Sequence, residues 1–181
     1  MAEPFPLIAI TLPGASSLGE AAAVVEALDS GAFSRVHIRK DAHADAVSLL
    51  RALPTRIHDK ISLHNALAAD VREFPHIGVH LTGRTPSAPA GFEGVLSRSC
   101  HSLAETDAFA SDVDYAFLSP VYDSLSKPGY NAAFSMAELA RAGAEGRLGR
   151  VFALGGVTPA RLRELQMLGF AGAAMLGAAW K

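Results

Sequence analysis

The chain has 181 residues, of which 50% are hydrophobic and 19% are charged, and its formal net charge is −2. This length suits one domain with a sizeable core over residues 1–181, and the apolar content excludes a disordered chain. With near-neutral charge and no cluster of Lys and Arg, a nucleic-acid partner is not expected.

Three features bear on where the protein resides. The N-terminal segment MAEPFPLIAITLPG lacks the basic region of a signal peptide. The longest apolar stretch, residues 169–180, is shorter than the roughly 20 residues that a membrane helix needs. The single cysteine, Cys100, cannot form an internal disulfide, which fits a reducing compartment. We therefore expect a soluble, cytoplasmic protein with no membrane partner.

Short apolar runs alternate with helical patterns along the whole chain. Alternating strands and helices imply parallel pairing through right-handed crossovers. The eight candidate strands are residues 7–11, 35–40, 60–64, 77–81, 94–100, 115–120, 151–156 and 172–177.

Local signals mark where the intervening helices begin and end. Capping boxes, in which a Ser and a Glu three residues later satisfy free amides, are expected at Ser17–Glu20, Ser102–Glu105 and Ser135–Glu138. Thr158 followed by Pro159 is typical of a helix start. Gly31 and Gly169 fit helix C-termini.

The fourth crossover, TGRTPSAPAGFE, contains two prolines and cannot hold an ordinary helix. Eight strands, one missing helix and an early end after the eighth strand predict a compact α/β protein, a single (β/α)8 TIM barrel below the usual size of about 250 residues. The alternative is an open doubly wound sheet, but TLPGASSLGE has the wrong glycine spacing for a dinucleotide fold.

Polar residues share one face of the second to fifth strands. Because side chains alternate along a strand and helices need an apolar outer face, this polar face should point into the barrel. Active sites of such barrels lie at the C-terminal strand ends. The inward set contains four histidines, one on each of these strands: His37, His64, His80 and His101.

Histidine is a common metal ligand, so these four residues raise the question of a metal site. A metal is disfavoured because no His-x-His occurs, the first strand offers no ligand and no carboxylate ends the last three strands. No metal site is therefore expected from the residue pattern. A cluster of buried core histidines and a pocket at the barrel mouth both remain open.

Cys100 and His101 resemble a nucleophile and its base, but neighbouring residues of a strand point to opposite faces. A nucleophile and base must approach within about 3 Å. We therefore expect Cys100 to pack against helices and His101 to face inward as a catalytic base. The positive end of the helix that begins at Ser102 should favour the neutral imidazole.

Three loops have features of an anionic ligand site. ALGGVTP, residues 153–159, and MLGAAW, residues 175–180, lead from strands into helical turns through glycines, and such loops often bind phosphate in barrels. The loop of residues 119–135 carries Ser124, Ser126 and Lys127 and is interpreted as a lid.

The segments HIRKD, IGVHLTGR, SRSCHSLAE, DYAFLSPVYDSLSKPGY, ALGGVTP and AAMLGAAW occur in an order and at intervals that resemble the thiamine phosphate synthase/TenI family. This resemblance implies a (β/α)8 barrel that binds thiazole phosphate at its mouth. Synthases of the family join a pyrimidine methyl pyrophosphate to the thiazole phosphate with Mg²⁺. TenI-like members instead aromatise the thiazole as tautomerases.

The resemblance implies roles for individual residues. His101 matches the proposed tautomerase base, and Arg39 matches an arginine that contacts pyrophosphate. The remaining substrate-binding candidates are Ser99, Ser124, Ser126, Lys127, Gly155, Gly156, Leu176 and Gly177, and His37, His64 and His80 are candidates for the pocket.

The chain departs from the synthase pattern where charge matters. Asp41 stands at the position of a lysine, unless Lys40 turns into the site, and His64-Asn65 replaces Asn-Asp. HLTGRTPSAP lacks the second aspartate, and Mg²⁺ prefers carboxylate oxygens. A metal-free TenI-like tautomerase, requiring no cofactor, is therefore slightly favoured. The alternatives are a divergent synthase, which would require Mg²⁺ and both substrates, and a non-catalytic thiazole-phosphate binding protein.

Aromatic residues also raise the question of a homodimer. Phe92, Phe170 and Trp180 are the candidates for an apolar interface. Single exposed apolar residues are common on monomers, so the pattern does not decide the oligomeric state.

Overall fold

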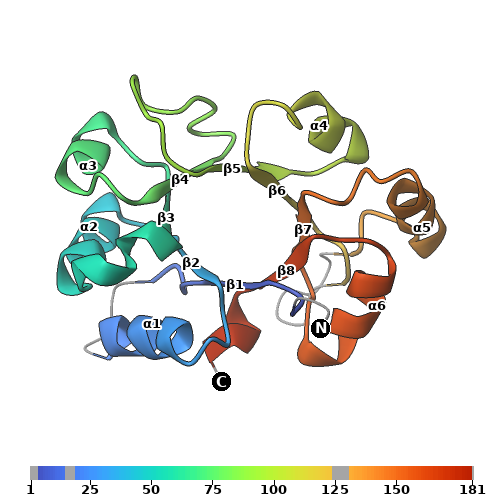
Figure 1. Cartoon of the computed structure of the whole chain (residues 1–181), viewed down its shortest axis with the longest axis horizontal. Coiled ribbons are helices and arrows are strands. Elements are labelled where there is room, and N and C mark those ends of the chain that lie inside the picture. The colour runs from blue at the N-terminus through green and yellow to red at the C-terminus, as the bar shows by residue number, and fades with distance from the viewer. Residues whose placement is uncertain (1–3, 15–18, 124–130, 181) are drawn as a thin grey trace.

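The computed structural model describes residues 4–14, 19–123 and 131–180. Eight parallel strands close into a barrel in chain order, and the helices surround it (Figure 1). The predicted TIM barrel is confirmed, and the open sheet is excluded because β1 pairs with both β2 and β8. The strands are β1 Leu7–Ile10, β2 Arg35–Ile38, β3 Ile61–His64, β4 Gly78–Leu81, β5 Leu96–Cys100, β6 Tyr115–Leu118, β7 Val151–Ala153 and β8 Gly172–Met175.

The helices connect successive strands, with one gap between β4 and β5. Prolines prevent a regular helix in that segment, as expected, and Figure 1 shows it as an irregular excursion. The helical elements are α1 Glu20–Asp29, α2 His43–Ala52, η1 Thr55–Lys60, α3 Ala68–Glu73, α4 Leu103–Ala108, α5 Met136–Ala144, η2 Pro159–Arg161, α6 Leu162–Met167 and η3 Gly177–Trp180. No helix among the described residues is both long and apolar enough to cross a membrane.

Strand alternation sorts the buried side chains into an outer and an inner set. On β2 to β4, Val36, Ile38 and Leu63 pack with helix residues such as Leu49 and Leu50 in the outer core. Burying each such side chain stabilises the fold by about 1.5–3 kcal/mol. The outward face of these strands is therefore apolar, as their sequence predicts.

The barrel interior is divided into an apolar and a polar half. Its apolar half comes from β1, β6 and β8, where Ile8, Ile10, Phe117 and Ala174 form a buried cluster. The polar half comes from β2 to β5, whose inner side chains include two histidines with no solvent exposure, His37 and His80. The polar residues expected inside the barrel therefore lie on one side of it.

Two of the three predicted capping boxes have a different form in the structure. Ser135 and Glu138 form the complete box at α5. Ser102 caps α4, but the Glu105 carboxylate accepts from the amide of His101 instead of Ser102. The box expected at Glu20 is wrong, because α1 begins at Glu20 and its carboxylate binds Lys40 instead; Ser17 lies outside the described residues.

The other helix boundaries agree only partly with the sequence signals. Gly31 and Gly169 have positive φ angles of 73° and 84° just after α1 and α6, as expected for C-terminal caps. Thr158 precedes Pro159, but its side chain makes no capping hydrogen bond, and the segment begins as the short η2 helix.

The aromatic residues considered for a dimer interface are occupied within the barrel itself. Phe170 is only 4% exposed and belongs to the outer core. Phe92 and Trp180 are partly buried against the other outer cluster, and the Trp180 indole N–H donates to the Ile10 carbonyl at 2.7 Å. These packing contacts lie within one chain, and the homodimer stays a prediction.

Candidate active site at the barrel mouth

The C-terminal ends of all eight strands open on one face of the barrel, because the strands are parallel. This face, called the mouth below, receives the residues that follow β2, β5, β7 and β8. Barrel active sites are built from such strand ends and the loops after them. The sequence candidates differ in their place relative to the mouth.

His37, His64 and His80, called the histidine cluster below, converge inside the barrel from β2, β3 and β4. His37 Nδ1 lies 3.0 Å from His64 Nε2, and the rings of His64 and His80 are stacked with centroids 4.1 Å apart. Strand register explains this contact, because His64 pairs directly with His80. The expectation that these three histidines face a common interior is confirmed.

Hydroxyl groups orient two rings of the cluster. The Tyr115 hydroxyl lies 2.6 Å from His37 Nε2. His80 is held between two serines, with Ser97 Oγ 2.8 Å from Nδ1 and Ser99 Oγ 2.9 Å from Nε2. The structure thus joins Ser99 to His80, and these contacts limit rotation of both rings.

Burial keeps the cluster uncharged near neutral pH. Loss of solvation lowers the pKa of His37 and of His64 well below the usual value, and lowers the pKa of His80 to about 3. The charges of Arg35, Arg39 and Arg98 add to this effect at His37, His64 and His80 respectively. All three imidazoles are therefore neutral bases at pH 7.

His101 lies apart from the cluster. It follows the last residue of β5 and is exposed at the mouth. Its ring Nδ1 lies 3.0 Å from the Ser119 carbonyl oxygen, which can only accept a hydrogen bond, so Nδ1 carries a proton. The neutral ring therefore has its free lone pair on Nε2. The expectation that all four histidines share one interior is wrong for His101, because the strand ends before it.

A carboxylate also lies close to His101, which the helix-dipole expectation did not include. Glu105 Oε2 accepts a hydrogen bond from the His101 amide at 2.7 Å. This negative charge opposes the positive end of α4, a helix of only six residues. The Nδ1 contact with Ser119, rather than the helix dipole, therefore fixes which ring nitrogen of His101 carries the proton.

Cys100 has no role in acid–base chemistry at the mouth. Its side chain has no solvent exposure, and burial raises the pKa of its thiol to about 11. A reactive cysteine needs a lowered pKa and access to the substrate. The expectation that Cys100 is a packing residue is confirmed.

The two cations after β2 point in different directions. Arg39 is exposed, and no hydrogen bond or ion pair of its guanidinium is found among residues 4–14, 19–123 and 131–180. Lys40 instead binds both oxygens of Glu20, at 2.6 and 2.8 Å, and the Leu12 carbonyl at 3.0 Å. With its side chain only 1% exposed, Lys40 does not turn into the mouth.

The candidate phosphate loops provide backbone amides rather than side chains. Gly155 and Gly156 follow β7 with φ angles of 91° and 64°, and Gly177 begins η3 after Leu176. Within the described part of the chain, the amides of Gly155, Gly156 and Gly177 donate no backbone hydrogen bond. Because β7 and β8 are neighbours, both loops leave the barrel at the same side of the mouth.

Ser124, Ser126 and Lys127, the candidate lid residues, lie outside the described residues. The structure resumes the loop at residue 131, where the Ala132 amide donates to Asp123 Oδ1 at 2.7 Å. The lid therefore stays a prediction.

Sequence reasoning missed Tyr115 and Phe117, which complete the interior beside the histidine cluster. The Phe117 ring lies 4.7 Å from the ring of His37 and 4.9 Å from that of His80, measured between centroids. Burial raises the pKa of Tyr115, so its hydroxyl stays protonated. Alternation along YAFLSP could have indicated both residues, because Tyr115 and Phe117 are two positions apart and share one strand face.

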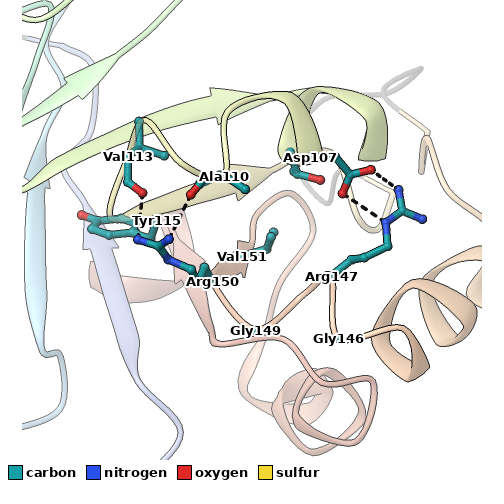
Figure 2. Close-up of a pocket in the computed structure, with 11 residues that line it drawn as sticks. Asp107, Ala110, Val113, Tyr115, Gly146, Arg147, Gly149, Arg150 and Val151 are labelled. Carbon is teal, nitrogen blue, oxygen red and sulfur yellow. Dashed lines mark hydrogen bonds and ion pairs between the residues drawn. The ribbon is translucent and has the colours of Figure 1, made fainter.

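Two surface cavities accompany the barrel. One, of about 690 Å³, lies at the mouth side beside Leu12, Glu20, Lys40 and Trp180. The other, of about 420 Å³, lies where β6 and β7 begin, away from the mouth. Figure 2 shows that the arginine side chains lining this second cavity already bond to carbonyl and carboxylate oxygens of the protein.

In this second cavity, Arg150 donates to the Ala110 and Val113 carbonyls, at 2.9 and 3.0 Å, and Arg147 pairs with Asp107. These guanidinium groups hold the loops before β6 and β7 in place. The cavity at the start of the strands is therefore not the candidate active site.

A family model and a curated relative indicate the same family. Residues 7–179 match the family model TMP-TENI, described as thiamine monophosphate synthase. A putative thiamine-phosphate synthase of Geobacter sulfurreducens (strain ATCC 51573 / DSM 12127 / PCA) is 31% identical over 173 residues, which cover 86% of this chain and 78% of that protein.

A second relative is longer than this chain. A thiamine-phosphate synthase of Synechococcus sp. (strain CC9605) is 36% identical over 128 residues, or 67% of this chain. The match spans only 34% of the Synechococcus protein. The remainder of that protein has no counterpart in this match.

A solved structure supports the same similarity in three dimensions. The crystal structure of thiamine phosphate pyrophosphorylase from Bacteroides thetaiotaomicron superposes with a TM-score of 0.82 and 31% sequence identity. The alignment covers 97% of this chain and 84% of that chain. The likeness therefore extends over the whole barrel.

Proposed function

The chain belongs to the thiamine monophosphate synthase (TMP-TENI) family, and from this premise we propose that it binds a thiazole phosphate at the barrel mouth and isomerises the thiazole ring as a TenI-like tautomerase. In this reaction a proton leaves one carbon of the heterocycle and is returned at another position, so the composition of the substrate does not change. The reaction needs one positioned base and an anchor for the phosphate.

The observation that carries the proposal is the contact of His101 Nδ1 with the Ser119 carbonyl. It leaves Nε2 as the proton acceptor of an exposed ring at the mouth. A base held in one tautomer can accept a proton and then return it, and such catalysis contributes about 10²–10⁴ in rate. His101 is the only one of the four inward-predicted histidines that is exposed at the mouth.

The anchor we propose is the pair of loops after β7 and β8. Among the described residues, the amides of Gly155, Gly156 and Gly177 donate no backbone hydrogen bond, so they can donate to phosphate oxygens, as backbone amides do in other barrels. Leu176 lies between β8 and the last of these amides. Arg39 and the lid residues Ser124, Ser126 and Lys127 are proposed as further contacts to anionic groups of a ligand, and Ser99 as a contact near its ring.

The Mg²⁺ ion used by synthases of this family does not fit the residues present after β3 and β4. Those positions carry His64, Asn65 and Thr82, and none is a carboxylate. The Asn65 side-chain oxygen already accepts from Thr82 and Thr85, at 2.5 and 3.2 Å. Mg²⁺ binds through carboxylate oxygens and water, so these donors do not form its site.

A divergent synthase is the second candidate, because the relatives named above are called thiamine-phosphate synthase or pyrophosphorylase. The free guanidinium of Arg39 supports it, since a pyrophosphate leaving group needs a positive charge. The third candidate is a non-catalytic thiazole-phosphate binder.

One assay separates these three functions. The purified chain is incubated with the thiazole tautomer substrate and, separately, with pyrimidine methyl pyrophosphate plus thiazole phosphate, each with Mg²⁺ or with EDTA. We expect isomerisation at equal rates in both buffers and no thiamine phosphate. Mg²⁺-dependent thiamine phosphate would establish the synthase, and thiazole-phosphate binding without turnover would establish the binder.

A further inference from the structure

We propose that the histidine cluster binds a late first-row divalent metal ion, with zinc as its representative. This site is separate from the proposed chemistry of His101, and neither proposal depends on the other. The sequence disfavoured a metal because it contains no His-x-His. In the structure, three adjacent strands each contribute one imidazole, so the ligands need no sequence motif.

The distances suit a shared ion. One nitrogen from each of His37, His64 and His80 lies within 4.8 Å of the others, and His37 Nδ1 and His64 Nε2 are 3.0 Å apart. A tetrahedral zinc ion with Zn–N bonds of 2.0–2.1 Å separates its nitrogens by about 3.3 Å. The pair at 3.0 Å is thus close to the bound spacing. His80, which is stacked on His64, turns one nitrogen away from its serine to bind the same ion.

Neighbouring hydroxyls hold two of the three rings, those of His37 and His80. When the Tyr115 hydroxyl accepts from His37 Nε2, the lone pair of Nδ1 faces His64. His80 has a serine hydroxyl at each nitrogen, so one serine still holds the ring after the other nitrogen binds the ion. Such contacts orient metal-bound imidazoles in known sites.

The charge state of the cluster favours some ions over others. The three imidazoles are neutral, so an ion need displace no proton at pH 7. The nearby cations Arg35 and Arg39 oppose a second positive charge, and no described carboxylate bonds to the cluster. Only ions with strong affinity for imidazole overcome this repulsion, which selects Zn²⁺, Co²⁺ or Ni²⁺ over Mg²⁺.

The first test is a titration with Co²⁺. The protein is first freed of metal with a chelator, without being unfolded. We expect one Co²⁺ per chain with the visible absorption of a four-coordinate site, and displacement of that absorption by Zn²⁺. His64→Gln, at the partly exposed member of the cluster, should weaken binding at least tenfold. His76→Gln, at an exposed histidine outside the barrel, is the matched control and should bind as the parent does.

A second measurement uses the parent protein alone, because a cluster variant that folds poorly would lose binding for another reason. In ¹⁵N-histidine spectra, stoichiometric Zn²⁺ should shift the signals of three imidazoles and leave those of His76 and His101 unchanged. Failure to bind Co²⁺ or Zn²⁺ at one equivalent overturns the proposal. Binding that is unchanged in folded His64→Gln, or shifts at other histidines, also overturns it, by placing the ion elsewhere.

Discussion

The ring of His101 and the backbone carbonyl of Ser119 lie 3.0 Å apart, and this contact connects the end of β5 to the residue after β6. Because a carbonyl oxygen can only accept, Nδ1 carries the proton, and Nε2 is left as the acceptor. The Glu105 carboxylate holds the His101 amide from the other side. The orientation of His101 is therefore set by backbone contacts, although its ring is exposed.

Replacing His101 by Ala should lower the kcat of isomerisation by about 10²–10⁴, because the base is lost while the mouth keeps its shape. The dissociation constant of thiazole phosphate should change little, since the proposed anchor is backbone amide. The measurement is steady-state kinetics together with calorimetric titration. His76→Ala, at an exposed histidine away from the mouth, is the control, and an isomerisation rate unchanged in His101→Ala would remove the base assignment.

The glycines of the phosphate loops should respond differently to an added methyl group. Gly156 has a φ of 64°, and a Cβ there would meet the Asp123 carbonyl and Tyr122. Such strain costs about 1–3 kcal/mol, so Gly156→Ala should lower the free energy of unfolding by that amount or more. Gly177 has no atom within 4 Å of an added Cβ, so Gly177→Ala should retain both stability and phosphate binding. Urea unfolding and phosphate titration provide the comparison, and equal stabilities would contradict it.

The strands and their inner faces could be predicted because alternation is a local property of the chain. Every predicted strand is present, and His37, His64 and His80 point inward as their positions indicate. The exposed position of His101 could not be predicted from alternation. Parity holds only while the strand continues, and β5 ends one residue earlier.

Contacts between distant parts of the chain were beyond the sequence pattern. Tyr115 meets His37 across 78 residues because closure of the barrel brings β6 opposite β2. Glu20 matches a capping motif, yet its carboxylate binds Lys40, which is 20 residues away. A local motif and a tertiary ion pair compete for the same group, and only the folded structure decides between them.

Cys100 should be nearly inert toward thiol reagents in the native protein. A pKa of about 11, against an ordinary 9.0, lowers the thiolate fraction at pH 8 about a hundredfold, and burial blocks access as well. Alkylation by iodoacetamide should therefore be at least about a hundredfold slower in buffer than in urea. Cys100→Ala should isomerise the thiazole at the parent rate. Rapid native alkylation, or loss of turnover in a folded variant, would restore the thiol as a candidate.

The buried ion pair of Lys40 and Glu20 should matter more than an exposed pair of similar geometry. Glu20→Ala leaves an unpaired ammonium whose side chain is 1% exposed, which should cost about 3–5 kcal/mol of unfolding free energy. Glu73→Ala breaks the pair with Arg51, whose side chains are 60% and 45% exposed, and should cost about 1 kcal/mol or less. Chemical denaturation of the two variants measures the difference. Equal losses would mean that Lys40 is accessible to solvent and free to turn into the mouth.

The histidine cluster should make the metal-free protein less stable in mild acid. Its folded-state pKa values lie below 6.5, with His80 at about 3, so the unfolded chain binds more protons than the folded one as the pH falls through 6.5. The contribution of the three histidines to the free energy of unfolding is thus fully present above this pH and is lost progressively below it. Each histidine contributes about 1.4 kcal/mol between pH 7.5 and pH 5.5, or about 4 kcal/mol for the three. Urea unfolding at the two pH values measures the loss, and His64→Gln should remove about a third of it, because Gln does not titrate. An unfolding free energy that is equal at both pH values would mean that the cluster takes up protons without unfolding.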